Sequence, residues 1–180
     1  MNITVYCGAA AGNDPAFAEA ARELGAWMAG HGHDLVYGAG STGLMGTVAR
    51  AVLDGGGQAV GVIPEFLVHV EPPVADLTEL HVVHTMFERK NLMIDFGDAF
   101  VALPGGSGTL EEISEIFSRL KLGYLSAPCI LLNVHGFYDP LAAMLDRMVA
   151  EGLFPQGARD LVSFPATVEE AAALIEKAAR

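Results

Sequence analysis

Short, mostly apolar runs alternate with helix-like segments along this chain, and this alternation constrains the fold more than any other feature. Strand-like runs are expected at residues 3–7, 35–37, 59–63, 80–83, 99–103, 129–134 and 161–162. These runs lack the alternating polar positions of a sheet with one face in water. Apolar strands that are separated by helices indicate a parallel sheet with helices on both faces.

The segments between these runs carry the end signals of helices. Asp14-Pro15 provides an N-cap and a first-turn proline, and Gly30 and Gly32 end the helix that follows. Further helices are expected at residues 44–53, 85–96, 140–149 and 168–179, and after the fifth strand as far as residue 122. We therefore predict one doubly wound α/β domain over residues 1–180, with ligands bound beyond the carboxyl ends of the strands.

The acidic balance of the chain narrows its partners. The 22 Asp and Glu residues outnumber the 10 Lys and Arg residues, and a net charge of -12 repels nucleic acid and anionic membranes. No apolar run approaches the roughly 20 residues of a membrane span, and the N-terminus does not resemble a secretory signal. Cys7 and Cys129 lie in apolar runs, which favours core thiols in a reducing compartment. We expect a cytoplasmic protein.

A first glycine loop spans residues 38–46 and reads G-A-G-S-T-G-L-M-G between the second strand and a helix. Its G-x-G-x-x-G spacing lets backbone approach a phosphate at a helix N-terminus, so Gly40 and Ser41 are candidate ligand contacts. The same spacing also occurs in tight turns that bind nothing. A dinucleotide site would normally follow the first strand and use a later acidic residue, for which Glu65 is only a loose match.

A second glycine loop follows the fifth strand and reads L-P-G-G-S-G-T-L-E-E over residues 103–112. Backbone N–H groups at such a helix start can surround one phosphate. The candidate phosphate-binding residues are Gly105, Gly106, Ser107, Gly108 and Thr109. No Lys follows the last glycine, so this is not a triphosphate P-loop. The structural alternative is a capping box formed by Thr109 and Glu112, which would only hold the helix end.

Two cations lie on the apolar side of the helix predicted at residues 85–96. A helical wheel places Arg89 and Lys90 among apolar side chains. A buried cation requires an anionic partner, which could be a ligand phosphate or a carboxylate such as Glu112. The alternative is that both long side chains extend past the apolar edge into water.

The helix after the second loop carries two adjacent carboxylates. Glu112 borders the apolar arc of its wheel and Glu111 lies farther out, so Glu112 is the better candidate for a half-buried acid. The six histidines lack ligand spacing, and no metal site is expected. Residues 68–78, with Pro72-Pro73, form the longest irregular connection and could be an active-site flap or a surface loop.

Together these motifs resemble the LONELY GUY (LOG) family of cytokinin riboside 5'-monophosphate phosphoribohydrolases, often labelled lysine decarboxylase-like. The family pattern P-G-G-x-G-T-x-x-E is complete at residues 104–112, and an Arg-Lys pair follows Met86-x-Glu88. The first glycine loop resembles G-G-G-S-x-G-L-M-G with Ala39 in place of a glycine. The N-terminal Y-C-G-A resembles Y-C-G-S with Ala9 in place of serine, which puts one hydroxyl contact in doubt.

The resemblance covers nearly the whole chain and implies a homodimeric, Rossmann-like enzyme. Such an enzyme hydrolyses the N-glycosidic bond of an N6-modified adenosine monophosphate, or of AMP, and releases the base and ribose 5-phosphate. The family's catalytic pair carries over to Arg89 and Glu112. Its phosphate- and ribose-binding residues carry over to the second glycine loop, with Met86, Lys90 and Glu111 adjoining. No cofactor is implied, and no lysine has the setting of a pyridoxal phosphate Schiff base.

Two other classes of function remain open at this point. A non-catalytic nucleotide or cofactor carrier of related fold would bind AMP without turnover, and a dinucleotide oxidoreductase would bind NAD. The sequence does not rank possible bases. Residues near Cys7 and the segment 68–78 are the candidates for the base pocket, together with a partner subunit.

Overall fold

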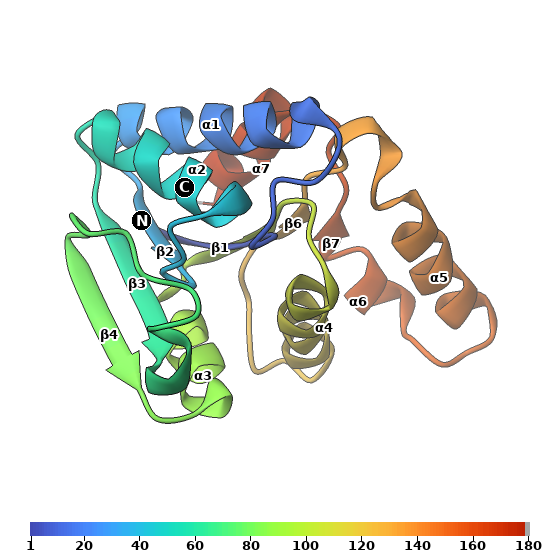
Figure 1. Cartoon of the computed structure of the whole chain (residues 1–180). Helices are drawn as coiled ribbons and strands as arrows, with labels where there is room; N and C mark the ends of the chain where they lie inside the picture. Colours follow the sequence, from blue (N-terminus) through green and yellow to red (C-terminus); the bar gives the residue numbers. More distant parts are fainter. Residues whose placement is uncertain (179–180) are drawn as a thin grey trace.

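The computed structural model describes residues 1–178, which form one seven-stranded sheet in the order β4-β3-β2-β1-β5-β6-β7 (Figure 1). Every pairing is parallel. The strands are β1 (Asn2–Tyr6), β2 (Asp34–Tyr37), β3 (Ala59–Pro64), β4 (Glu79–Val83), β5 (Ala99–Ala102), β6 (Cys129–Leu131) and β7 (Val162–Ser163). The chain starts at the central strand and winds outward in both directions, as the apolar strand pattern predicts.

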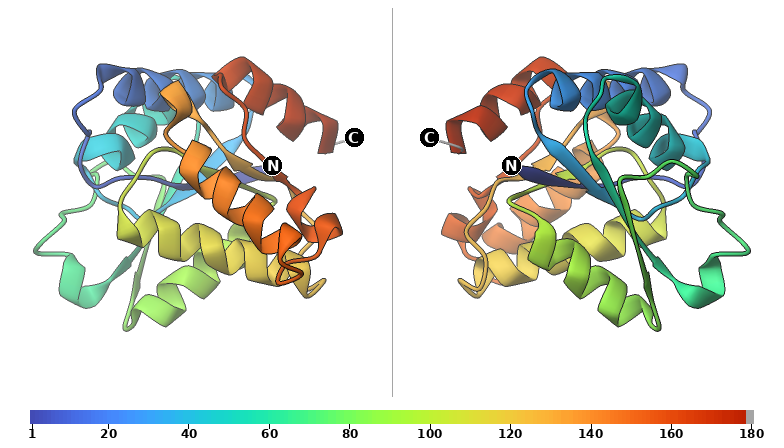
Figure 2. Two further views of the ribbon diagram at one scale, coloured as in Figure 1. Left: turned by 90° about the vertical axis from the view of Figure 1, so that its right-hand side faces the viewer. Right: turned by 90° about the vertical axis from the view of Figure 1, so that its left-hand side faces the viewer.

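Helices cover both faces of the sheet (Figure 2). One face carries α1 (Pro15–Gly30), α2 (Gly43–Asp54) and α7 (Val168–Ala178), whose apolar sides share a core with Ile3, Leu35 and Val101. The other face carries α3 (Met86–Phe96), α4 (Ser107–Lys121), α5 (Asp139–Ala150) and α6 (Gln156–Arg159). The alternate strand residues, such as Val36 and Phe100, pack there. None of the helices formed by residues 1–178 has the length and hydropathy that crossing a bilayer requires.

The helix ends follow the expected chemistry. The Asp14 side chain accepts a hydrogen bond from the Ala16 N–H at 2.9 Å, and Pro15 occupies the first turn of α1. A capping box that the sequence analysis did not single out begins α3, because the Thr85 hydroxyl accepts from the Glu88 N–H at 3.1 Å and the Glu88 carboxylate accepts from the Thr85 N–H at 3.3 Å.

The sixth strand is shorter than predicted. It ends at Leu131 rather than at residue 134, and the chain passes into the short 3-10 helix η2 (Val134–Gly136). Asn133 explains the turn, because its side chain accepts from the Tyr138 N–H and donates to Asp139, both at 2.7 Å. A second 3-10 helix, η1 (Glu65–Leu67), and the four-residue α6 were also not predicted. The last helix was expected to reach residue 179, which lies outside the described residues.

The strand order reverses beside β1. From β1 the sheet extends through β2 and β3 on one side and through β5 on the other, so the loops that leave β1 and β5 diverge. In doubly wound folds this point at the carboxyl edge is where ligands bind. The two glycine loops, η1 and the first turns of α3 and α4 all lie at this edge.

Candidate active site

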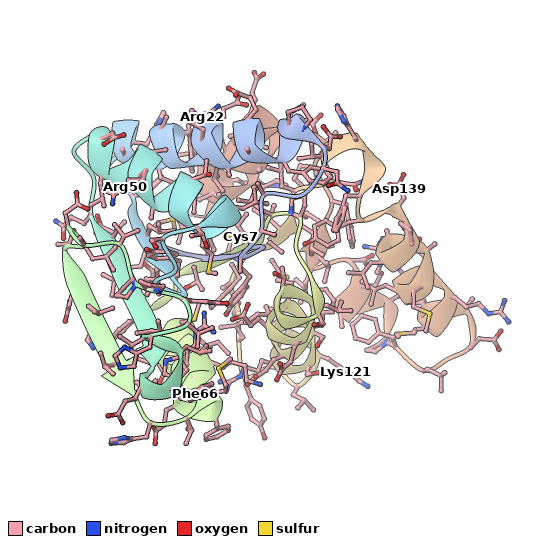
Figure 3. All side chains as sticks on the ribbon, in the orientation of Figure 1. Cys7, Arg22, Arg50, Phe66, Lys121 and Asp139 are labelled. Atoms are coloured by element: carbon pink, nitrogen blue, oxygen red, sulfur yellow. The ribbon has the colours of Figure 1, made fainter. Side chains whose placement is uncertain are left out.

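A cavity of about 280 Å³ opens at the carboxyl edge of the sheet where the strand order reverses. Cys7, labelled in Figure 3, lies on it directly after the central strand β1. The second glycine loop forms one wall of the cavity, and side chains of α3 and α4 also line it. Its principal lining residues are Cys7, Gly38, Leu67, Glu71, Met86, Arg89, Gly106, Ser107, Gly108, Thr109, Glu111 and Glu112.

The N-terminus of α4 faces this cavity. Gly106 is the N-cap residue and makes no side-chain cap, so the first-turn N–H groups of α4 have no side-chain acceptor from the cap. Gly105 has no room for a side chain, because a Cβ there would lie 2.1 Å from Thr109 Oγ1. The capping-box alternative is wrong, because Thr109 lies inside the first turn of α4 and not at its N-cap. Uncapped N–H groups at the start of a helix can bind an anion.

Arg89 is buried and is held by backbone carbonyls. It is 7% exposed. Its Nε donates to Val62 O at 3.1 Å and its Nη2 donates to Gly38 O at 3.2 Å. The sequence predicted a phosphate or a carboxylate as the partner of Arg89, and it did not predict these two carbonyls. Nη1 has only a long contact of 3.8 Å with Met86 Sδ, which is a weak acceptor. This amino group therefore retains donors for a ligand.

Gly38 is required for this placement of Arg89. A Cβ at Gly38 would lie 1.9 Å from Arg89 Nη2. The first glycine loop thus contributes to the cavity by making room for the guanidinium. Of the loop residues, Gly38 and Met45 line the cavity, and the two predicted contacts Gly40 and Ser41 do not.

Glu112 is half-buried, and burial raises its pKa from 4.5 to about 7. The positive charges of Arg89 and Lys90 lower the pKa of Glu112, whereas the negative charges of Glu111 and Glu71 raise it further. Within residues 1–178, no hydrogen bond or ion pair engages the Glu112 carboxylate, so the contact with Arg89 that the sequence suggested is not formed. Arg89 therefore acts on Glu112 through its charge across the cavity.

Lys90 joins α3 to α4. Its Nζ lies 2.8 Å from Glu111 and 3.3 Å from Glu115, and Arg119 extends the network from Glu115 to Asn91. Hydrogen bonding to Glu111 raises the pKa of Lys90 further. Of the remaining predicted site residues, Met86, Glu111 and residues 106–109 line the cavity. Lys90 and Gly105 do not line it.

The segment 68–78 is bonded to the first glycine loop. The Ser41 N–H donates to Pro72 O and the Val74 N–H donates to Ala39 O, both at 3.1 Å, and Gly40 pairs with Pro73 in an isolated antiparallel bridge. This attachment places Leu67 and Glu71 on the cavity. Sequence reasoning pointed to the segment and missed Glu71 itself. A carboxylate directly before Pro72-Pro73 was the signal that could have identified it.

A family model described as "Possible lysine decarboxylase" matches residues 45–175. The cytokinin riboside 5'-monophosphate phosphoribohydrolase LOG of Oryza sativa subsp. japonica is 45% identical over 175 residues, which are 97% of this chain and 72% of that protein. The Rhodococcoides fascians protein of the same activity name is 44% identical over 97% of this chain and 88% of its own length. Arabidopsis thaliana LOG1 is 44% identical over 93% of this chain and 79% of its own length.

Solved structures share the fold. The molybdenum cofactor carrier protein from Chlamydomonas reinhardtii has a TM-score of 0.74 at 24% identity, covering 99% of this chain and 97% of its own. The molybdenum cofactor binding protein from Rippkaea orientalis has a TM-score of 0.73 at 20% identity, covering 99% of this chain and 96% of its own. At these identities the likeness establishes the α/β architecture and nothing further.

Proposed function

The chain belongs to the lysine decarboxylase-like (LOG) family, whose curated members are named cytokinin riboside 5'-monophosphate phosphoribohydrolases, and from this membership we propose that it hydrolyses N6-modified adenosine 5'-monophosphates or AMP. The products are the free base and ribose 5-phosphate. One observation carries the proposal within the structure. An uncapped helix N-terminus, a buried arginine and a half-buried carboxylate with a raised pKa all face one cavity.

The N-terminus of α4 holds the 5'-phosphate. Backbone N–H groups of residues 107–109 point out of the first turn, and the positive end of a 15-residue helix attracts the anion. The phosphate takes no part in breaking the glycosidic bond. It fixes the ribose beside Glu112, about one helical turn farther along α4. Such positioning from a remote group can supply several kcal/mol of the barrier reduction.

Glu112 acts on the reacting carbon. As the C1'–N bond breaks, its electron pair leaves with the base and positive charge builds on the ribose. The Glu112 carboxylate stabilises this charge and accepts a proton from the water whose oxygen bonds to C1'. The base nitrogen that loses C1' gains a proton, and Glu112 gives up the one it took from the water, so hydrolysis consumes one water and no net proton. A pKa of about 7 for Glu112 means that carboxylate and acid are both populated near neutrality, which suits a group that takes up and returns a proton.

Arg89 supplies a fixed positive charge. Its two hydrogen bonds to backbone carbonyls hold the guanidinium on the cavity wall, and its charge favours the ionised form of Glu112 against the effect of burial. Nη1 is free to bind an oxygen of the nucleotide. A lysine decarboxylase would instead need a lysine that forms a Schiff base with pyridoxal phosphate. Lys90 is bound to two glutamates, and no lysine is among the described residues that line the cavity.

The test is release of free base. Purified protein is incubated with AMP and with N6-isopentenyl-AMP, and the products are separated by chromatography. We expect adenine and isopentenyladenine to appear with ribose 5-phosphate, and Glu112→Gln to slow release by at least about a hundredfold. Binding of either nucleotide without any released base would instead identify a carrier and overturn the proposal.

We also propose that the protein acts as a homodimer in the cytoplasm. Phe66, Val70 and Phe87 are large exposed apolar side chains on η1, the segment 68–78 and the first turn of α3, which border the cavity (Phe66 is labelled in Figure 3). A second copy that covers this face would remove them from water. Light scattering on the purified protein is expected to give twice the 18.9 kDa chain mass. A Phe66→Asp, Phe87→Asp variant should give the single mass, and cell fractionation tests the location.

A further inference from the structure

The cavity has a fixed order along the carboxyl edge of the sheet. The second glycine loop follows β5, Cys7 follows β1, Gly38 follows β2, and Leu67 and Glu71 follow β3. From β5 to β3 the sheet advances three inter-strand steps, which at about 4.8 Å each is roughly 14 Å. A mononucleotide that lies across the strands therefore has its phosphate at α4 and its base toward β3.

Glu71 lies on the wall at the β3 end of this cavity. Its side chain is half-buried, and within residues 1–178 it forms no hydrogen bond or ion pair. Its position is set by the backbone around it, because the Glu71 N–H donates to Leu67 O at 2.8 Å and the adjoining Pro72 carbonyl accepts from the Ser41 N–H. A partly desolvated carboxylate without a partner is unfavourable unless a ligand supplies a hydrogen-bond donor.

Two apolar side chains accompany Glu71. Leu67 from η1 and Met86 from the first turn of α3 line the same cavity, and both are half-buried. Aliphatic and thioether groups pack well against a flat aromatic ring, so this end of the cavity suits a nucleobase better than it suits a sugar or a phosphate. A phosphate would also be repelled by the carboxylate of Glu71.

We infer that the Glu71 carboxylate accepts a hydrogen bond from the exocyclic N–H of the base and so selects 6-aminopurine nucleotides that keep at least one such hydrogen. This inference rests on the proposed function and makes it narrower. Adenine has two exocyclic hydrogens and an N6-monosubstituted adenine has one, so both satisfy the carboxylate. An N6,N6-disubstituted adenine has none and leaves Glu71 unpaired, which is the situation in which hydrogen-bonding sites discriminate most strongly.

The experiment compares N6-methyl-AMP with N6,N6-dimethyl-AMP, which differ by one methyl group in place of the N–H. For wild type we expect kcat/KM to be roughly tenfold to a hundredfold higher for the monomethyl substrate, as for a hydrogen bond to a charged group. In Glu71→Ala the two kcat/KM values should differ by no more than about threefold, because activity on the monomethyl substrate is lost. Glu71→Gln keeps an acceptor oxygen and should retain part of the preference.

Glu65→Ala is the matched control. Glu65 is an exposed glutamate in the same part of the chain, its carboxylate lies 3.7 Å from the His84 ring, and neither residue lines the cavity. It should leave the substrate preference at the wild-type value. Circular dichroism of all three variants confirms that a change in preference is not a change in folding.

Two results would overturn the inference. One is an unchanged preference in Glu71→Ala. The other is an equal loss of kcat/KM on both substrates, which would place Glu71 at the ribose or in the bond-breaking step. Failure of the proposed function is a separate result, namely no base release by wild type from either substrate. Calorimetric Kd values for the same two nucleotides would then test the base contact without turnover.

Discussion

Replacing Glu112 with glutamine should change how the stability of the protein depends on pH. Burial raises the pKa of Glu112 from 4.5 to about 7 in the folded protein. Between these two values the folded state binds a proton that the unfolded chain has released, so wild-type stability falls as pH rises through this window. Glutamine has nearly the same shape as glutamate and does not titrate, so the stability of the variant does not fall with pH for this reason.

The size of the effect follows from the pKa shift. A rise from 4.5 to about 7 corresponds to roughly 3 kcal/mol of folding free energy, fully expressed above pH 7 and absent below pH 4.5. The difference in unfolding free energy between Glu112→Gln and wild type should therefore increase by about 3 kcal/mol from pH 4.5 to pH 8. Urea denaturation at fixed protein concentration across this range measures it, because titrations common to both proteins cancel.

Glu115 provides a control of opposite sign on the same helix. Burial raises its pKa, but hydrogen bonds from Arg119 and Lys90 outweigh burial and lower the pKa overall. Glu115 therefore stabilises the fold above its ordinary pKa and loses this contribution as pH falls, so Glu115→Gln should become less stable than wild type as pH rises. If the stability difference for Glu112→Gln stayed constant across the pH range, the desolvated carboxylate would be refuted.

Three further predictions concern the cavity. Gly38→Ala places a Cβ 1.9 Å from Arg89 Nη2, so it should displace the guanidinium and lower kcat/KM for AMP by at least about tenfold. Lys90→Ala removes the links to Glu111 and Glu115 and should cost about 1 kcal/mol in urea denaturation while changing kcat/KM far less than Arg89→Ala does. The kcat/KM of wild type should rise with pH through a midpoint near 7 if Glu112 acts as the carboxylate, and a profile flat from pH 5 to 9 would contradict that role.

Much of the fold could be predicted because its signals are local. Wholly apolar strands such as residues 99–102 are typical of a parallel sheet between helices, and Asp14-Pro15 sets the start of α1. The end of β6 could not be predicted in the same way. Leu132 and Val134 continue the apolar run on either side of Asn133, and what ends the strand is a turn held by the Asn133 side chain, whose partners are Tyr138 and Asp139.

The candidate site was also predictable only in part, and Arg89 shows why. The helical wheel predicted that Arg89 is buried, but its partners are the carbonyls of Val62, within β3, and of Gly38, directly after β2. This detail matters for the chemistry, because a direct ion pair with Arg89 would hold the pKa of Glu112 well below neutrality. Carbonyl oxygens fix the guanidinium without neutralising it, so its charge only partly offsets burial and the pKa of Glu112 stays near 7. The pKa of Glu112 thus depends on how β2 and β3 lie against α3, which is a property of the assembled sheet.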